Sequence, residues 1–122
     1  MDEIKTVDRY QIYVGLNDKD ALTQRFDTEM LCRIAKLVCH NYAGAYSMNL
    51  INGGYVHDNG AFTEENTIVL TLIDVTKEHV DEIAMDLCTF FRQESVMVTK
   101  DVVSSYMVRC PLPDVYTIQK NR

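Results

Sequence analysis

The sequence predicts an α+β domain in which two helices cover one face of a single β-sheet. Three observations support this class: strands in which apolar residues alternate, two helical stretches with apolar stripes of matched length, and the order in which these elements follow one another. The chain has 122 residues, of which 47% are hydrophobic and 25% charged. This balance is typical of a globular protein, and we expect a single domain over residues 1–122 with its core between about 10 and 110.

The first strand and the first helix are predicted from their spacing. From Tyr10 to Leu16 every second residue is apolar, as in a strand with one buried face. Residues 17–23 are polar and predict a loop. A helix then begins after Asp27, a good N-cap residue, and ends near Gly44. Its apolar stripe recurs at helical spacing and consists of Leu31, Ile34, Ala35, Val38 and Tyr42.

A β-hairpin is expected next. Residues 45–57 predict an extended strand that Gly53 and Gly54 interrupt, and paired glycines suggest a bulge or a close approach of another backbone. His57-Asp-Asn-Gly60 predicts the turn, because Asn-Gly tolerates the positive φ angles of tight hairpins. The β-branched, apolar residues 67–73 predict the returning strand.

The second helix completes the pattern. It begins at Thr76, and its apolar stripe is Val80, Ile83, Ala84, Leu87 and Phe91. Two further strands are expected, residues 95–100 and residues 102–109, before Pro111. The order β-α-β-β-α-β with helical crossovers predicts a ferredoxin-like two-layer sandwich, to which an added C-terminal strand contributes one edge.

The sheet face turned away from the helices is expected to be partly apolar. By alternation it displays Tyr13, Gly15, Asn49, Ile51, Val69, Thr71, Ile73, Met97 and Thr99. Such a face is unusual on the surface of a monomer. We therefore expect a homodimer or a higher homo-oligomer, or a ligand that covers this face.

Composition and motifs exclude several classes of function. The net charge is −6 and the basic residues are scattered, which argues against general nucleic-acid binding. The four cysteines and three histidines lack the spacing of a metal site, so we expect no metal and no cofactor. No apolar run approaches the length of a membrane span, and we expect a cytoplasmic protein without membrane contact.

Two places carry candidate functional residues. Gln93 and Glu94 follow the second helix, where a desolvated Glu94 would serve as a general base. The alternative is that Gln93 caps the end of the helix, while Glu94 accepts backbone N–H bonds or pairs with a basic residue. Near the hairpin turn, His57 lies in sequence between Tyr55 and the pair Glu64-Glu65; it would move protons there, or it is simply part of the turn. Adjacent carboxylates in a strand point to opposite faces, which argues against a metal site at Glu64 and Glu65.

Four short motifs resemble a family of unknown function. They are Tyr13-Val-Gly-Leu16, Gly53-Gly-Tyr55, Gly60 together with Glu64-Glu65, and Gln93-Glu-Ser-Val96. The chain is similar over residues 10–108 to small bacterial and phage-type proteins with a C-terminal "QESV" signature. The resemblance implies the ferredoxin-like fold and positions to watch, and it implies no catalytic role. Tyr55 stands where we expect Trp in many members.

Two hypotheses of function follow. The first is a non-enzymatic, homo-oligomeric binding protein that engages its partner through Tyr13, Gly53, Gly54, Tyr55, Gln93 and Glu94. The resemblance to phage-type proteins suggests that the partner is a host defence protein or a nucleotide signal. The alternative is a small dimeric enzyme, related in architecture to α+β barrels, that uses Glu94 or His57 for acid–base chemistry.

Overall fold

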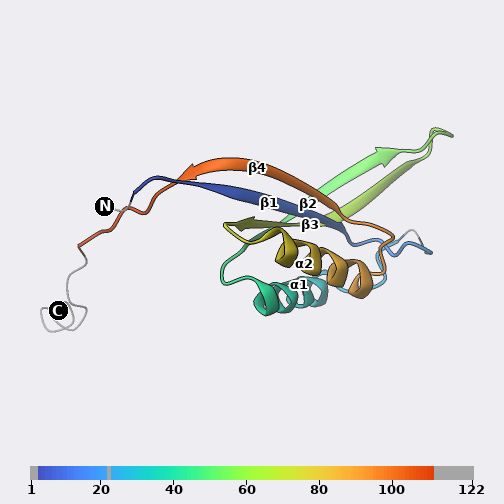
Figure 1. Cartoon of the computed structure of the whole chain (residues 1–122). Helices are drawn as coiled ribbons and strands as arrows, with labels where there is room; N and C mark the ends of the chain where they lie inside the picture. The colour runs from blue at the N-terminus through green and yellow to red at the C-terminus, as the bar shows by residue number, and fades with distance from the viewer. Residues whose placement is uncertain (1–2, 22, 112–122) are drawn as a thin grey trace, which may run out of the picture.

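The computed structural model describes residues 3–21 and 23–111 and confirms the ferredoxin-like two-layer sandwich. The elements follow in the order β1 (Lys5–Gly15), α1 (Thr28–Tyr42), β2 (Ser47–Val56), β3 (Phe62–Ile73), α2 (Lys77–Phe90) and β4 (Met97–Ser105). The strands form one antiparallel sheet in the order β2-β3-β1-β4. Both helices lie on the same face of this sheet (Figure 1).

The prediction of an added C-terminal strand was wrong for the described residues. One continuous strand, β4, replaces the two strands expected at 95–100 and 102–109, and residues 106–111 lie outside it. The strand continues through Asp101, the residue between the two expected strands, and both Asp101 and the preceding Lys100 have a partner on β1. Asp101 pairs with Arg9, and Lys100 Nζ lies 3.7 Å from Asp8 Oδ1.

The paired glycines form no bulge, and of the two expected alternatives it is the close approach that the structure shows. Gly53 pairs with Glu65 and Gly54 with Glu64 in an unbroken register. The close approach is at Gly54, where a Cβ atom would lie 2.5 Å from Cζ of the covering Phe62 ring and 3.0 Å from the Thr63 backbone oxygen. The turn itself falls where expected, with Gly60 at a φ of 88°.

Both helices begin at the residues that the sequence predicts. The Asp27 side chain accepts a hydrogen bond from the Glu29 N–H, and the Thr76 side chain accepts one from the His79 N–H. Such caps satisfy backbone donors that lack a partner within the helix. They therefore fix where the two helices start relative to the strands before them.

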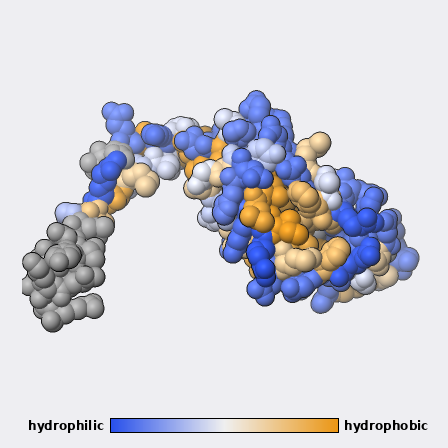
Figure 2. Space-filling model, turned by 90° about the horizontal axis from the view of Figure 1, so that it is seen from below, coloured by the Kyte–Doolittle hydropathy of each residue, from blue (hydrophilic) through white to orange (hydrophobic). Residues whose placement is uncertain are grey.

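The core lies between the helices and one face of the sheet. Its strand residues alternate along β1 and β3, and its helix residues form one stripe on each helix. The largest enclosed side chains are Ile12, Val14, Ile68, Leu70, Leu72, Val80, Ile83 and Leu87. Figure 2 looks onto the helical layer and shows a patch of apolar residues surrounded by hydrophilic ones. Among the exposed apolar side chains of the helices are Met30, Leu37, Met85 and Phe90.

Two pairs of strands extend past the helices. The β2–β3 hairpin projects beyond one end of the helical layer, and the start of β1 runs with the end of β4 beyond the other end (Figure 1). Almost all of β2 is exposed. Neither α1 nor α2 lies over these ribbons, so the helical layer leaves part of their apolar surface uncovered.

Removing a core side chain should destabilise the fold. Leu70 is fully buried, whereas Leu50, directly across from Ile68 on the neighbouring strand, is half exposed. We expect Leu70→Ala to lower the free energy of unfolding by about 2–5 kcal/mol, because it removes buried methyl groups and leaves a cavity. Urea denaturation measures this change. The control Leu50→Ala should cost less than about 1 kcal/mol; equal costs for both variants would contradict this description of the core.

Candidate functional site

The open face of the sheet carries the residues that alternation predicts. The strand register places all nine of them on one side, opposite the helices. Ile51, Ile73 and Met97 are exposed by 44%, 49% and 57%, while Val69 is buried in the centre of the face. The open face is therefore a mixed surface with large apolar side chains, and no layer formed by the described residues covers it.

Glu65 belongs to the same face and is the carboxylate that stands out there. It is half-buried, and its side chain lies over Gly15 on β1. A Cβ atom at position 15 would lie 2.5 Å from the Glu65 carboxyl carbon, so only glycine leaves room for this arrangement. Glu65 Oε2 accepts a hydrogen bond of 3.0 Å from the Asn17 N–H.

Open space adjoins Glu65 on its other side. Gly53 stands directly opposite Glu65 on β2, and apart from its two chain neighbours no described residue places a heavy atom within 4 Å of the position that a Cβ atom would take there. Tyr55, two residues further along β2, is a diagonal neighbour of Glu65 on the same face. Its ring contacts His57, with 4.7 Å between the ring centroids. A carboxylate, an aromatic ring and bare backbone thus lie side by side.

The charge of Glu65 is not compensated by a neighbouring cation. No Lys, Arg or His of the described part of the chain forms an ion pair with it. The Asn17 N–H is a neutral donor, which orients a carboxylate without cancelling its charge. Such a group can bind a cationic ligand or accept a proton.

Gln93, predicted from sequence, is connected to this region through Asn17. The Gln93 side-chain amide donates to the Asn17 carbonyl at 2.5 Å, and the Asn17 side chain donates to the Glu64 carbonyl at 3.1 Å. The structure therefore links the junction after α2 to the glycine hairpin, the two regions that the sequence singled out separately. Gln93 also donates to the Phe91 carbonyl, so it fills the helix-capping role that was the alternative.

Glu94 and His57, the two acid–base candidates, do not meet. Glu94 is exposed and lines a groove of about 440 Å³ between α2 and the start of β4, together with Met85, Cys88 and Val96. His57 is half-buried in the hairpin turn, where its Nε2 lies 2.7 Å from Thr63 Oγ1. No hydrogen bond connects the two residues within the described ranges.

The remaining sequence candidates are placed on both faces. Tyr13 lies on the open face, where its hydroxyl donates to Gln11 Oε1 at 3.2 Å. Gly54 faces the opposite side of the hairpin, under Phe62. Glu64 and Glu65 alternate in the register and so point to opposite faces, as expected. No cluster of potential metal ligands occurs among residues 3–21 and 23–111.

A buried carboxylate that the sequence did not suggest holds the loop after β1. Asp18 is only 4% exposed. Its Oδ1 accepts from the Asp20 and Ala21 N–H groups, and its Oδ2 lies 2.6 Å from Arg92 Nε and 3.6 Å from Arg25. The N–H bond from Asp20, followed by the contact with Arg92, lowers the pKa of Asp18 to about 2. This pair joins the β1–α1 loop to the α2–β4 junction.

The sequence gives only weak signals for the roles of Asp18, Arg92 and Asn17. Asp18 reads as one more polar residue of a loop, and its partner Arg92 is 74 residues away in the chain. Arg92 has a positive φ of 53°, which sequence reasoning anticipates at Gly or Asn and not at Arg. Asn17 contributes mainly through its backbone, for which side-chain chemistry gives no signal.

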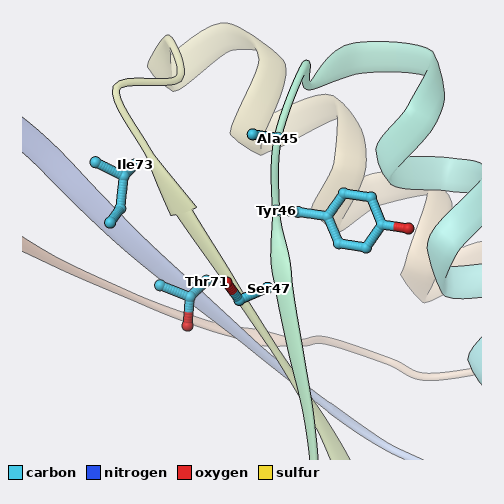
Figure 3. Close-up of a pocket in the computed structure, with 5 residues that line it drawn as sticks. All are labelled: Ala45, Tyr46, Ser47, Thr71 and Ile73. Atoms are coloured by element: carbon cyan, nitrogen blue, oxygen red, sulfur yellow. The ribbon is translucent and has the colours of Figure 1, made fainter. Parts of the chain in front are cut away.

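A small hollow at the other end of the hairpin carries no comparable chemistry. It has a volume of about 130 Å³ and is lined by Ala45, Tyr46, Ser47, Thr71 and Ile73. Figure 3 shows the Tyr46 ring turned toward α1, away from Thr71 and Ile73. The Tyr46 hydroxyl is 3.2 Å from His40 Nε2, so it is already engaged.

Neither helix of the described chain has the length and apolarity needed to cross a lipid bilayer.

Comparison with known proteins finds similar structures. No model of a protein family matches the chain, and no curated protein does. A phage SAM lyase in complex with S-methyl-5'-thioadenosine superimposes with a TM-score of 0.59 and 24% identity over 83% of this chain and 90% of that one. A phage SAM lyase in the apo state gives 0.57 and 23% over 93% and 98%. CutA from Synechococcus elongatus gives 0.55 and 14% over 84% and 85%. These likenesses confirm the small α+β fold.

The Asp18–Arg92 pair should make stability depend on acid pH. The pKa of Asp18 is about 2 in the folded chain and near 4 in an unfolded one, so its ionised form stabilises the fold above about pH 4. This contribution is lost as the pH falls from about 4 toward about 2. We expect the urea midpoints of wild type and Asp18→Asn to differ most near neutral pH and to converge over that range.

The control for this experiment is Asp81→Asn, which removes an exposed ion pair with Lys77 on α2. Its urea midpoint should stay close to that of wild type at every pH. A difference between wild type and Asp18→Asn that is unchanged at the lowest pH would contradict the assignment.

Proposed function

We propose that the protein is a homo-oligomeric lyase that acts on S-adenosylmethionine, with Glu65 facing the sulfonium group of the substrate. The observation that carries this proposal is the half-buried carboxylate of Glu65, which lies between two glycines on the open face and has no cationic partner among residues 3–21 and 23–111. A sulfonium is a cation without hydrogen-bond donors. A carboxylate and an aromatic face are the groups that bind such a cation.

The likeness to the phage SAM lyases suggests which sulfonium compound to test. One of those structures contains S-methyl-5'-thioadenosine. Formation of that product from S-adenosylmethionine breaks the bond between the sulfonium sulfur and the γ-carbon of the amino-acid chain. The electron pair stays on sulfur, which becomes a neutral thioether. A lyase uses no water, so the γ-carbon must form its new bond within the substrate. Either a nucleophilic group of the substrate attacks the γ-carbon, or the neighbouring carbon loses a proton to a base and a double bond forms.

The geometry around Glu65 supports binding of the adenosyl and amino-acid parts as well. Gly53 leaves bare backbone next to the carboxylate, where a flat ligand has room to lie. Tyr55 offers an exposed ring on the same face, on which an adenine base would stack. This assignment replaces Glu94 and His57 with Glu65 as the charged residue of the enzyme hypothesis.

Binding without turnover is the second candidate function. It is favoured by the composition of the open face, where glycines, tyrosines and amides outnumber ionisable groups. In that case the protein captures the adenosyl compound as a nucleotide-like signal. Glu65 would then supply affinity only.

Turnover by Glu65 can be tested directly. We expect wild type to convert S-adenosylmethionine to S-methyl-5'-thioadenosine, detected by liquid chromatography and mass spectrometry. Glu65→Gln should lower kcat/KM by about 10- to 100-fold, because it removes a charge–charge interaction of roughly 1.4–2.8 kcal/mol. Glu64→Gln is the matched control: its side chain is next in sequence but points to the other face, and its kcat/KM should stay within about twofold of wild type.

Other outcomes separate the candidates. Calorimetric binding of S-adenosylmethionine without product would favour the capture hypothesis. An equal loss of activity in Glu64→Gln would show that charge near the hairpin matters, and not the position of Glu65. Neither binding nor product would refute both candidates.

We also propose that a second copy of the chain covers the open face. Ile51, Ile73 and Met97 are exposed there, and the edge strands β2 and β4 leave backbone groups unpaired. Both features promote association. A shared interface would also shield Glu65 from water and strengthen its interaction with a cation.

Light scattering at micromolar concentration tests the assembly. We expect a mass that is a multiple of 14.0 kDa. Met97→Glu should shift the protein toward the monomer, because it introduces a charge into the covered face. Met85→Glu is the control, since Met85 is 70% exposed on α2, in the helical layer. A wild-type mass of a single chain would contradict the assembly.

A further inference from the structure

We propose that Gln93 is a positioning residue for Glu65 and acts through the backbone of Asn17. This inference rests on the proposed function, in which Glu65 faces the sulfonium group. The Gln93 amide donates to the Asn17 carbonyl at 2.5 Å, and the Asn17 N–H donates to Glu65 Oε2 at 3.0 Å. The two hydrogen bonds hold Asn17 from both sides of its Cα atom, so they restrict the direction of its N–H group.

The Gln93 side chain starts from a fixed point. Its own N–H donates to the Cys88 carbonyl at 3.0 Å, which ties it to the last turn of α2. The preceding residue, Arg92, binds Asp18 and Asp20, each at 2.6 Å. The Lys19 N–H also donates to the Arg92 carbonyl. These contacts fix the α2–β4 junction relative to the β1–α1 loop. Gln93 therefore has a defined position from which its side chain can orient the backbone of Asn17.

Glu65 depends on this link for its orientation. Among the described residues, the Asn17 N–H is the hydrogen-bond donor to its side chain. Gly15, beneath the carboxylate, offers no side chain against which it could pack. If the Asn17 N–H turned away, the Glu65 side chain would lose the contact that selects one rotamer.

The choice of an amide at position 93 has an electrostatic consequence. An arginine or lysine there would bring a positive charge toward Asn17 and Glu65 and would compete with a cationic ligand. Gln93 supplies a donor without charge. It fixes the geometry while leaving the negative charge of Glu65 available.

The test uses Gln93→Leu, which keeps the approximate volume and removes the donor. Thr89→Val is the matched control, because it also removes a hydrogen bond at the end of α2, from Thr89 Oγ1 to the Met85 carbonyl, without a link to Asn17. Full-length, ¹⁵N-labelled protein reports on the Asn17 amide by NMR. We expect its resonance to move in Gln93→Leu and in Glu65→Gln, and to stay in place in Thr89→Val.

Binding and turnover then separate positioning from a merely structural role. S-methyl-5'-thioadenosine is neutral at sulfur, so its affinity should not depend on how Glu65 is aimed. We expect Gln93→Leu to lower kcat/KM for S-adenosylmethionine by about tenfold and to leave the Kd for S-methyl-5'-thioadenosine within about twofold. Thr89→Val should change neither value.

Three results would overturn the inference. One is an Asn17 amide that does not move in Gln93→Leu. Another is an equal loss of affinity for the neutral thioether, which would mean that the site has collapsed. The third is unchanged kcat/KM in that variant. If wild type neither binds nor converts S-adenosylmethionine, the proposed function fails, while the NMR experiment still decides whether Gln93 sets the contact between Asn17 and Glu65.

Discussion

The structure depends on the burial of two apolar helix stripes against one and the same face of the sheet. Ile12, Leu70 and Ile83 are among the side chains that this packing removes completely from water. Each strand–helix–strand connection brings its helix back onto the same side of the sheet, as right-handed crossovers do in this topology. The second face consequently has a rigid support, and the described part of the chain forms no layer over it. A surface of that kind can hold side chains in place without hiding them.

Two carboxylates near the end of β1 illustrate how differently the chain treats negative charge. Asp18 is buried, accepts two backbone hydrogen bonds and contacts two arginines, so its charge stabilises the loop. Glu65 is only half-buried and receives a single neutral donor from the same loop. The first carboxylate holds the loop in place, and the loop holds the second. Asn17 lies between the two carboxylates: it precedes Asp18 in the sequence, and its N–H donates to Glu65. The charge of Asp18 stabilises the loop, whereas the charge of Glu65 is left available for a ligand.

The parts of the fold that follow from local patterns could be predicted from the sequence. The apolar periods of α1 and α2, the caps at Asp27 and Thr76, and the alternation along β1 and β3 depend on neighbouring residues only. The continuity of β4 could not be predicted, because the ion pairs of Lys100 with Asp8 and of Asp101 with Arg9 become apparent only once β1 and β4 lie side by side. The nine residues of the open face could be predicted because successive side chains of a strand point to opposite faces of the sheet.

The candidate site was predictable in part for the same reason. The motifs at Gly53 and Gln93 drew attention to the two regions that the structure connects. The connection itself joins Asn17 to Glu65, 48 positions away in the sequence, and to Gln93, 76 positions away. It passes through a loop whose residues show no recognisable functional motif. The importance of Glu65 depends on the absence of a side chain at Gly15, which becomes meaningful only once β1 and β3 lie side by side.

The contact between Asn17 and Glu65 has an implication for how such sites diverge. The donor is a peptide N–H, which every amino acid except proline carries. With respect to this bond, evolution is free to exchange the side chain at position 17 while the interaction survives. At position 17 the hydrogen bond from the Asn side chain to the Glu64 carbonyl would then restrict the choice of residue, and the bond that orients the carboxylate would not. The trace of its role would appear elsewhere, in a persistent small residue beneath the carboxylate and a retained amide at the far end of the loop.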